Sequence, residues 1–169
     1  YLYGGAGLGK THLMHSIGHF ILDQNPDMKV LYVTSEQFTN EVIESIRSGN
    51  SSKINNFREK YRTVDVLLID DIHFLQGKEG TQEELFYAFN SLHDKKAQMV
   101  FTCDRPIREI RNMTERLLSR LSNGLCIDLQ PPTYETRCAI IQKKLELQNK
   151  QLSSEIIDFI AKNVQTNIR

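Results

Sequence analysis

The stretch GGAGLGKT, residues 4–11, fits the pattern G-x-x-x-x-G-K-[ST], in which a glycine-rich loop runs into a helix. A triphosphate is highly negative, and backbone N–H groups surround it only where no Cβ stands in the way. Lys10 supplies a positive charge for the β- and γ-phosphates, and the Thr11 hydroxyl suits Mg²⁺. The helix starting at Lys10 directs its positive end at the phosphates. The pattern predicts a nucleotide site; the alternative is a plain glycine-rich turn.

Composition limits the classes of protein to which the chain can belong. Its 169 residues are enough for one sizeable core, or for one domain and part of a second. The formal net charge is zero, so any nucleic-acid contact has to come from a local patch. No apolar run has the length of a membrane helix, and no signal peptide precedes the first strand. The three cysteines lack C-x-x-C spacing and indicate reduced thiols in a cytoplasmic protein.

Apolar β-runs alternate with helical patterns through most of the chain. The runs Val30–Thr34, Val64–Ile69 and Gln98–Cys103 read as buried strands, as in a sheet covered on both faces. Such alternation predicts an α/β fold of three layers, with a central parallel sheet between helices and right-handed crossovers. Two helices, about residues 36–62, separate the first two of these runs, which is more than one crossover requires.

Acidic residues follow two of the strands at the edge where open α/β sheets bind ligands. Asp70 is expected to hold Mg²⁺, and Asp71 to polarise an attacking water. Asp104, after the strand ending at Cys103, is placed to sense a γ-phosphate. The alternatives are a solvated strand end for the first two and a loop acid paired with Arg105 for the third.

Several local expectations concern the helices. Leu13, Ile17, Phe20 and Ile21 mark the buried stripe of a helix at about residues 10–23, and three histidines (His12, His15, His19) lie near one of its faces. No carboxylate or cysteine accompanies these histidines at ligand spacing, so a metal site there is not favoured. Ser35 is expected to cap the next helix, and Thr81 to open another through a capping box.

Arginines are frequent between the last two strands. Arg116 and Arg120 are four residues apart, on one side of a helix, and an arginine presented in this way can reach a phosphate in a neighbouring subunit. The alternative is a solvated charged face. After Pro131-Pro132 the pattern becomes helical only, with Thr133 and Ser153 as caps and Ile156, Ile157, Ile160 and Ala161 as the second buried stripe. We expect an α/β core over residues 1–130 and the beginning of a separate helical unit over 131–169, with further segments beyond both ends.

The residues together resemble the AAA+ ATPase domain of bacterial DnaA-type replication initiators, a P-loop NTPase family. The resemblance extends beyond the phosphate loop and covers essentially all 169 positions. It rests on residues 3–15 (YGGAGLGKTHLMH), 64–74 (VDVLLIDDIHF), 82–84 (QEE), 104–106 (DRP) and 116–120 (RLLSR).

The resemblance implies a role for each matching position. Nucleotide binding would involve Gly5, Gly7, Leu8, Gly9, Lys10, Thr11, His12 and, as the lid arginine of sensor 2, Arg169. Thr11 and Asp70 would hold Mg²⁺, and Lys10, Asp71, Asp104 (sensor 1) and Arg120 would serve catalysis. Arg120 would be an arginine finger acting on the ATP of the next subunit, with Arg116 an accessory residue at that interface.

The resemblance also implies partners. The extra helices would hold single-stranded DNA, with Ile46 and Lys78 as the matched positions, and a helix-turn-helix domain outside these 169 residues would read duplex origin DNA. The implied function is an ATP-controlled assembly that opens origin DNA, is turned off by slow hydrolysis to ADP, and works with a replicative helicase or its loader. Three alternatives stay open: a related AAA+ helicase loader or initiation regulator, a small-molecule P-loop kinase, and a binding module that never hydrolyses ATP.

Overall fold

The computed structural model describes residues 1–164, and contacts between residues divide the chain into two compact units. The first contains Tyr1–Gly4 and Lys10–Asp128, and the second contains the loop Gly5–Gly9 and the residues from Leu129 onward. No helix within residues 1–164 is both long and apolar enough to cross a membrane.

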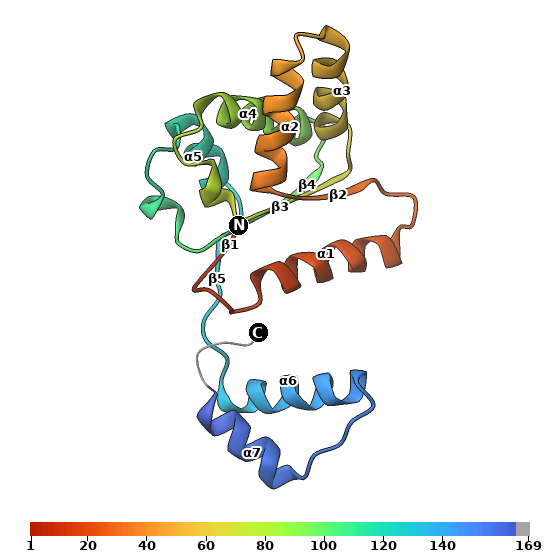
Figure 1. Cartoon of the computed structure of the whole chain (residues 1–169), viewed down its shortest axis with the longest axis vertical. Coiled ribbons are helices and arrows are strands. Elements are labelled where there is room, and N and C mark those ends of the chain that lie inside the picture. Colours follow the sequence, from red (N-terminus) through yellow and green to blue (C-terminus); the bar gives the residue numbers. More distant parts are fainter. Residues whose placement is uncertain (165–169) are drawn as a thin grey trace. The chain divides into compact units, whose positions relative to one another are not determined.

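A five-stranded parallel sheet forms the centre of the first unit (Figure 1), in the order β2-β3-β4-β1-β5. The strands are β1 (Leu2–Tyr3), β2 (Val30–Thr34), β3 (Val66–Asp70), β4 (Gln98–Cys103) and β5 (Ile127–Asp128). Every residue of β3 is buried, as the continuous apolar run predicts. The predicted α/β fold with a central parallel sheet is confirmed.

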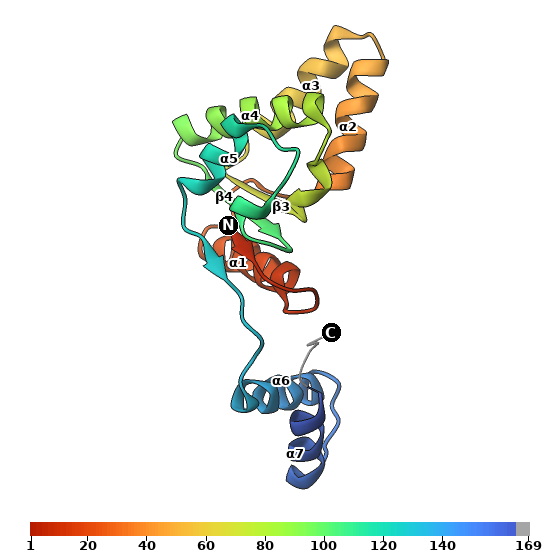
Figure 2. The same cartoon turned by 90° about the vertical axis from the view of Figure 1, so that its left-hand side faces the viewer.

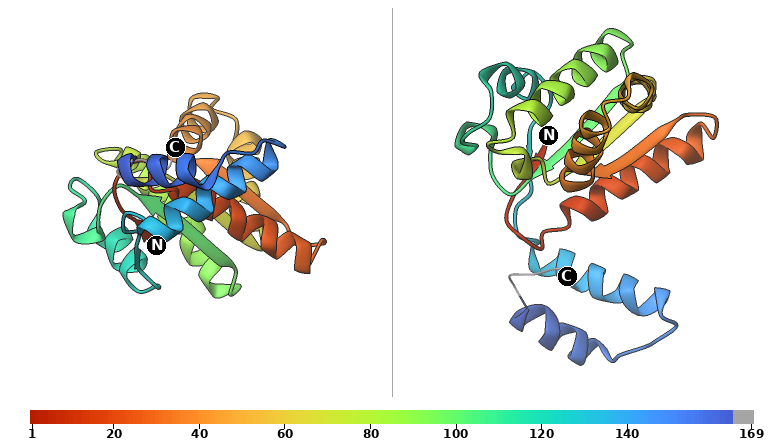
Figure 3. Two further views of the ribbon diagram at one scale, coloured as in Figure 1. Left: turned by 90° about the horizontal axis from the view of Figure 1, so that it is seen from below. Right: turned by 45° about the horizontal axis from the view of Figure 1, so that its top comes forward.

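Helices cover both faces of this sheet. Figure 2 shows α1 (Lys10–Gln24) alone on one side, where it contacts β2, β3 and β4. On the opposite side, also visible in the right-hand view of Figure 3, lie four helices: α2 (Ser35–Arg47), α3 (Ser51–Arg62), α4 (Glu79–Asp94) and α5 (Glu115–Ser122). The pair α2 and α3 is inserted between β2 and β3, and short 3₁₀ helices η1 (Ile72–Leu75) and η2 (Ile107–Glu109) follow β3 and β4.

Aromatic packing joins the two inserted helices to each other, and a shared carboxylate joins α3 to α4. Phe38 of α2 packs against Phe57 and Tyr61 of α3, with ring centroids 5.6 Å and 4.8 Å away. Glu84 of α4 accepts from Arg58 at 2.6 Å and from Arg62 at 3.3 Å, and its side chain is only 13% exposed. Because this carboxylate is mostly withdrawn from water, the paired arginines hold α3 against α4 more firmly than surface ion pairs would.

The predicted buried stripe of α1 is wrong in part. The residues buried in α1 are Lys10, Met14 and Gly18, whereas Leu13 is 37% and Phe20 65% exposed. The glycine decides this orientation, because it lets the helix backbone approach β2 and β3 closely. A Cβ at position 18 would stand 2.9 Å from Leu68 Cδ1 and 3.6 Å from Val30 Cγ1.

Two predicted helix caps are also wrong. Ser35 does not cap α2: its hydroxyl donates to the Asp70 carbonyl at 3.0 Å, and Thr34 forms the capping box with Gln37 instead. The capping box at Thr81 does not form, because α4 already begins at Glu79. Both side chains are buried, and at Ser35 the tertiary contact overrides the local preference for capping.

The close approach at Gly18 gives a stability prediction. We expect Gly18→Val to lower the free energy of unfolding by about 2 kcal/mol, because a branched side chain would overpack against Leu68, which is itself buried. Urea denaturation measures the change. His19→Val, at the exposed neighbouring position of the same helix, is the matched control and should stay within about 0.5 kcal/mol of the parent. Equal midpoints for the two variants would contradict the proposed packing.

The second unit contains the helices α6 (Tyr134–Leu147) and α7 (Ser154–Asn163). Thr133 caps α6 by accepting from the Thr136 amide, as predicted. Arg137 of α6 donates to the Ala161 carbonyl at 2.7 Å, and the Tyr134 hydroxyl donates to Asp158. Ile157 and Ala161 are buried, but Ile156 is 46% exposed, so its predicted burial is wrong.

Candidate functional site

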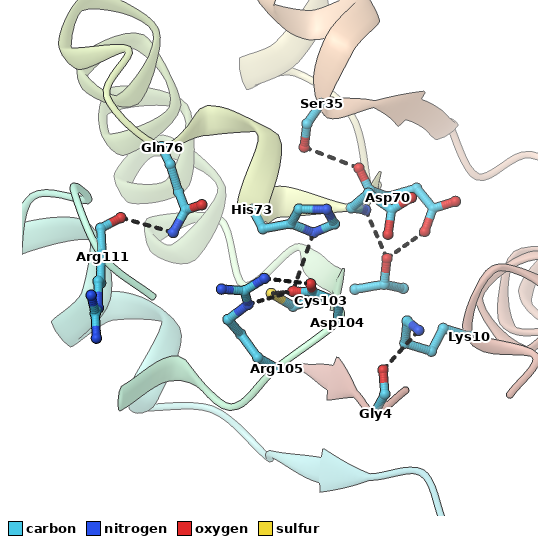
Figure 4. Close-up of polar contacts among 12 residues, drawn as sticks. Gly4, Lys10, Ser35, Asp70, His73, Gln76, Cys103, Asp104, Arg105 and Arg111 are labelled. Carbon is cyan, nitrogen blue, oxygen red and sulfur yellow. Dashed lines mark hydrogen bonds and ion pairs between the residues drawn. The ribbon is translucent and has the colours of Figure 1, made fainter. Parts of the chain in front are cut away.

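The carboxylate of Asp70 is the best-connected polar group at the carboxyl end of β3. The residue as a whole is 4% exposed, and its Oδ2 accepts from the Thr11 hydroxyl at 2.8 Å and from the Tyr32 hydroxyl at 3.2 Å. Its Oδ1 accepts from the Thr102 hydroxyl, as shown in Figure 4. Because β3 lies between β2 and β4, the parallel register brings donors from both neighbouring strands to the same carboxylate. The structure therefore joins Thr11 and Asp70, which the sequence predicts as a pair of Mg²⁺ ligands.

Lys10 is the first residue of α1 and is buried, with 8% exposure. Its ammonium group donates to the Gly4 carbonyl at 2.9 Å (Figure 4), so the side chain folds back toward the end of β1. The loop between them needs glycine for its backbone conformation, since Gly7 and Gly9 have φ values of 76° and 89°. A Cβ at Gly9 would meet nothing within 4 Å, so conformation and not space requires glycine there. Gly5 and His12 are exposed, and Leu8 is half-buried.

Asp71 has a strained backbone beside the buried acid. Its φ and ψ are 56° and 54°, a left-handed conformation that is uncommon outside glycine. Its amide donates to Thr102 Oγ1 at 2.8 Å, which fixes the turn after β3. Burial and the neighbouring Asp70 raise the pKa of the Asp71 carboxyl above its usual value. A raised pKa makes this carboxylate a stronger base than a solvated aspartate.

Asp104 is held on two sides. Arg105 donates to both of its carboxylate oxygens, at 2.8 Å and 2.6 Å, and His73 Nδ1 lies 3.6 Å from Oδ1 (Figure 4). The Arg105 guanidinium lowers the pKa of Asp104 to about 2, so the group is a carboxylate at neutral pH. The pairing with Arg105, which the sequence leaves open as an alternative, is present in the structure.

The oxygen donors around Asp70 fit Mg²⁺. This ion prefers hard oxygen ligands, and it typically takes one or two carboxylates and keeps several waters beside substrate phosphates. A buried carboxylate 2.8 Å from a threonine hydroxyl is a donor pair of that type. Among residues 1–164, the cluster of histidine, cysteine and acidic side chains close enough to hold a metal lies elsewhere, at His73, Cys103 and Asp104, and none of the α1 histidines belongs to it.

The two predicted interface arginines lie on α5. The Arg116 guanidinium carbon stands 5.1 Å from the centroid of the Phe86 ring in α4, a cation–π distance. Arg120, one turn later, is half-buried, and within residues 1–164 no side chain or carbonyl pairs with its guanidinium. Arg120 is therefore an available cation on a helix that is anchored to α4.

The remaining predicted residues lie away from Asp70. Ile46 is 56% exposed in the last turn of α2, and Lys78 is exposed immediately before α4. The second half of α2, which contains Ile46, and the start of α3 form an open hollow. Its lining residues are Asn40, Ile43, Glu44, Arg47, Ser48 and Lys53. Arg169 lies outside the described residues.

Three polar residues that sequence reasoning missed complete this part of the molecule. Thr102 bridges Asp70 and the Asp71 amide, Tyr32 donates to Asp70, and His73 faces Asp104. A threonine next to the end of a buried strand is the one available signal, because a polar group in such a position needs a partner. Tyr32 gives no signal, since aromatic residues are ordinary in strands.

Comparison with known proteins agrees with this arrangement. The family model for the bacterial DnaA ATPase domain matches residues 1–128. The chromosomal replication initiator protein DnaA of Lachnoclostridium phytofermentans is 57% identical over 169 residues, which is 100% of this chain and 37% of that protein. The crystal structure of domain III of DnaA from Thermotoga maritima superposes with a TM-score of 0.93 and 47% identity, covering 99% of this chain and 69% of that one.

A further solved structure is of a protein bound to ligands. A replication initiator DnaA bound to AMPPCP and single-stranded DNA matches with a TM-score of 0.86 and 35% identity, covering 99% of this chain and 50% of that chain. The chain thus spans a little over a third of the curated relative and half of this ligand-bound structure.

Proposed function

The chain belongs to the family of bacterial DnaA ATPase domains, and from that membership we propose that it binds ATP with Mg²⁺ and uses the nucleotide to control its assembly on single-stranded DNA. The observation that carries this proposal is the hydroxyl–carboxylate contact of Thr11 with Asp70 beside the buried Lys10. A relative of 35% identity binds AMPPCP and single-stranded DNA, which supports both parts of the proposal.

ATP would be bound by its phosphates. The amides of the loop Gly5–Gly9, together with Leu8 and His12 at its end, would contact the phosphates, and Lys10 would pair with the β- and γ-phosphates. Thr11 and Asp70 would hold Mg²⁺, which supplies positive charge against the developing negative charge of the phosphates. Arg169 is proposed to complete the site from the lid, over residues 131–169.

Hydrolysis would be slow and would end the active state. Asp71 is proposed to accept a hydrogen bond from the attacking water, a role that its raised pKa supports. Asp104, ionised and oriented by Arg105, is proposed to sense the γ-phosphate through that water. Conversion to ADP removes the γ-phosphate, and with it the contact that distinguishes the two nucleotide states.

Assembly would depend on a residue supplied by a second copy of the chain. Arg120 is proposed to reach the γ-phosphate of the ATP in the adjoining subunit, and Arg116 to support the same interface. A charge-assisted pair of this kind is available with ATP and absent with ADP. Only such a differential contact lets a ligand shift an equilibrium between separate and assembled protein.

Single-stranded DNA would contact the inserted helices. The exposed Ile46, the hollow beside it with Arg47 and Lys53, and Lys78 offer an apolar contact and positive charge. Both types of contact serve single-strand binding without base-specific readout. Since the chain carries no net charge, its binding to DNA should rest on local positive charge such as these residues supply.

The wider role is proposed for the whole initiator. A domain outside these residues would bind duplex origin DNA, and the assembled protein would favour strand opening and then engage a replicative helicase or its loader in the cytoplasm. The share of the curated relative that this chain spans, 37%, leaves ample length for such a domain in proteins of this family.

Sedimentation velocity tests the proposed switch. The protein is run with a non-hydrolysable ATP analogue or with ADP, each with and without an unstructured single-stranded oligonucleotide. We expect larger species only with the ATP analogue, and a further increase when the oligonucleotide is added, because only the γ-phosphate completes the interface. A monomer under all four conditions would contradict the proposal and favour a loader, a regulator or a kinase.

A further inference from the structure

Three side chains of different chemistry converge beside Asp70, where η1 and the end of β4 meet. His73 comes from η1, Cys103 is the last residue of β4, and Asp104 follows it. Figure 4 shows the imidazole, the thiol and the carboxylate facing one another. Both His73 Nδ1 and Cys103 Sγ lie 3.6 Å from Asp104 Oδ1, and the three donor atoms all lie within 4.8 Å of one another.

The imidazole of His73 is unusual in its surroundings. Its Nδ1 is buried and, among residues 1–164, is the one buried side-chain nitrogen or oxygen that makes no hydrogen bond. The side chain as a whole is 17% exposed, so the ring is held in place and Nδ1 is turned toward Asp104. Buried polar atoms without a partner are rare, because an unpaired atom has lost its hydrogen bonds to water and gained none in the protein. A bound ion would give this nitrogen the partner that it lacks.

We propose that His73, Cys103 and Asp104 form a binding site for a divalent transition-metal ion, with Zn²⁺ the ion that these donors favour. Zinc binds thiolate at about 2.3 Å and imidazole or carboxylate at about 2.0–2.2 Å. Tetrahedral bonds of those lengths place the donor atoms roughly 3.3–3.6 Å apart. Two of the three spacings in the structure already have that value. A small rotation of the His73 ring toward the thiol would bring the third into range.

Binding would rearrange little else. Asp104 Oδ2 could keep its hydrogen bond from Arg105 Nη2 while Oδ1 turns to the metal. The Cys103 thiol would pass its proton to solvent, since the thiolate is the ligand; burial raises the pKa of this thiol, so the metal itself has to displace the proton. Three protein ligands leave a fourth position for water, the arrangement of an open zinc site.

The consequence for the ATPase rests on the proposed function. A metal at this site would hold the carboxylate of Asp104, which is proposed to sense the γ-phosphate, and would place a positive charge next to it. We therefore expect bound Zn²⁺ to lower ATP turnover. The ion would act through the protein's own sensing residue and not by competing with Mg²⁺ at Asp70, where the donors are hard oxygens.

Cobalt spectroscopy tests the site without reference to activity. The probe is Co²⁺, added to a protein in which Cys126 and Cys138 are serine, so that Cys103 is the sole thiol. We expect one equivalent to give a thiolate-to-cobalt charge-transfer band with the intense visible bands of a tetrahedral site, and Zn²⁺ to abolish them. In this background His73→Gln should weaken Co²⁺ binding at least about tenfold and Cys103→Ser should remove the charge-transfer band. His19→Gln, an exposed histidine of α1, is the matched control and should change nothing.

Three outcomes of the Co²⁺ titration would contradict the metal site. It fails if no charge-transfer band appears, if the band survives Cys103→Ser, or if His73→Gln binds Co²⁺ as tightly as the background protein while its urea midpoint shows that it is folded. A Lys10→Ala variant should bind Co²⁺ normally, which separates failure of the metal site from failure of the nucleotide site. A normal band with unchanged ATP turnover would keep the site and reject its inhibitory effect.

Discussion

Replacing Lys10 by alanine is expected to weaken binding of a non-hydrolysable ATP analogue at least about 100-fold, or roughly 2.7 kcal/mol. Lys10 is only 8% exposed at the start of α1, so the attraction of its ammonium group to phosphate is screened less than that of a surface lysine. Its position 2.9 Å from the Gly4 carbonyl holds it near the end of β1, where the phosphate loop begins. Equilibrium titration with a fluorescent analogue at fixed salt measures the loss.

Lys29→Ala is the control for charge. Lys29 is exposed just before β2, and its removal changes the net charge by the same amount. We expect its affinity for the analogue to stay within about twofold of the parent. The fold of Lys10→Ala should remain, since alanine favours helix and the loss of a side-chain hydrogen bond such as the one to Gly4 costs about 1 kcal/mol. Near-parental affinity in a folded Lys10→Ala protein would contradict the assignment of this loop as the nucleotide site.

The strands could be predicted from the sequence almost to the residue. The bounds expected for Val30–Thr34 and Gln98–Cys103 are those observed, because continuous runs of apolar and β-branched residues are bounded by polar turns. Each strand could be identified from its own sequence, because a strand covered on both faces is apolar along its whole length, whichever strands lie beside it. Position in the sheet is different: the order of the strands follows from packing and not from any one run.

The starts of helices are harder to predict from the sequence than the strands, because the same types of polar side chain serve both as caps and in tertiary contacts. Gln82 lies in a sequence that reads as a capping box, yet it is fully buried. Its amide nitrogen donates to the carbonyls of Leu75 and Asn112, and its oxygen accepts from the Thr114 amide. Those partners are seven to 32 residues away, so no local pattern reveals them. The bonds tie the start of α4 to the turn that precedes α5.

The residues of the candidate site also differ in whether a local motif or a long-range contact defines them. Lys10, Thr11 and Asp70 could be predicted because each lies in a short motif with a chemical reason for its residue types. His73 gave no signal and Thr102 only the signal of a polar residue near a strand end, since their partners come from the register of β3 beside β4 and from the turn after Asp71. The contact of Thr11 with Asp70 spans 59 residues, and only the fold turns these two motifs into one site.

Arg120→Ala is expected to remove ATP-dependent assembly while leaving ATP binding nearly intact. The residue's guanidinium pairs with no side chain within residues 1–164, so its removal breaks no hydrogen bond or ion pair inside the described chain. Losing a charge-assisted pair at each subunit contact should raise the concentration needed for assembly at least about tenfold. Sedimentation with the ATP analogue measures assembly, and analogue titration of the same samples measures binding. Equal loss of both would count against a role in the neighbouring subunit.

Two neighbouring arginines make this test specific. Arg108→Ala removes the same charge from the exposed η2 turn and should assemble normally. Arg116→Ala should weaken assembly less than Arg120→Ala does, because its guanidinium already lies over the Phe86 ring and would have to leave that cation–π contact to reach a phosphate. Arg120→Lys keeps the charge but not the planar fork, so it should recover only part of the assembly. This order of effects follows from a finger that binds phosphate with its guanidinium, whereas a general electrostatic contribution would give three similar alanine variants and an Arg120→Lys protein close to the parent.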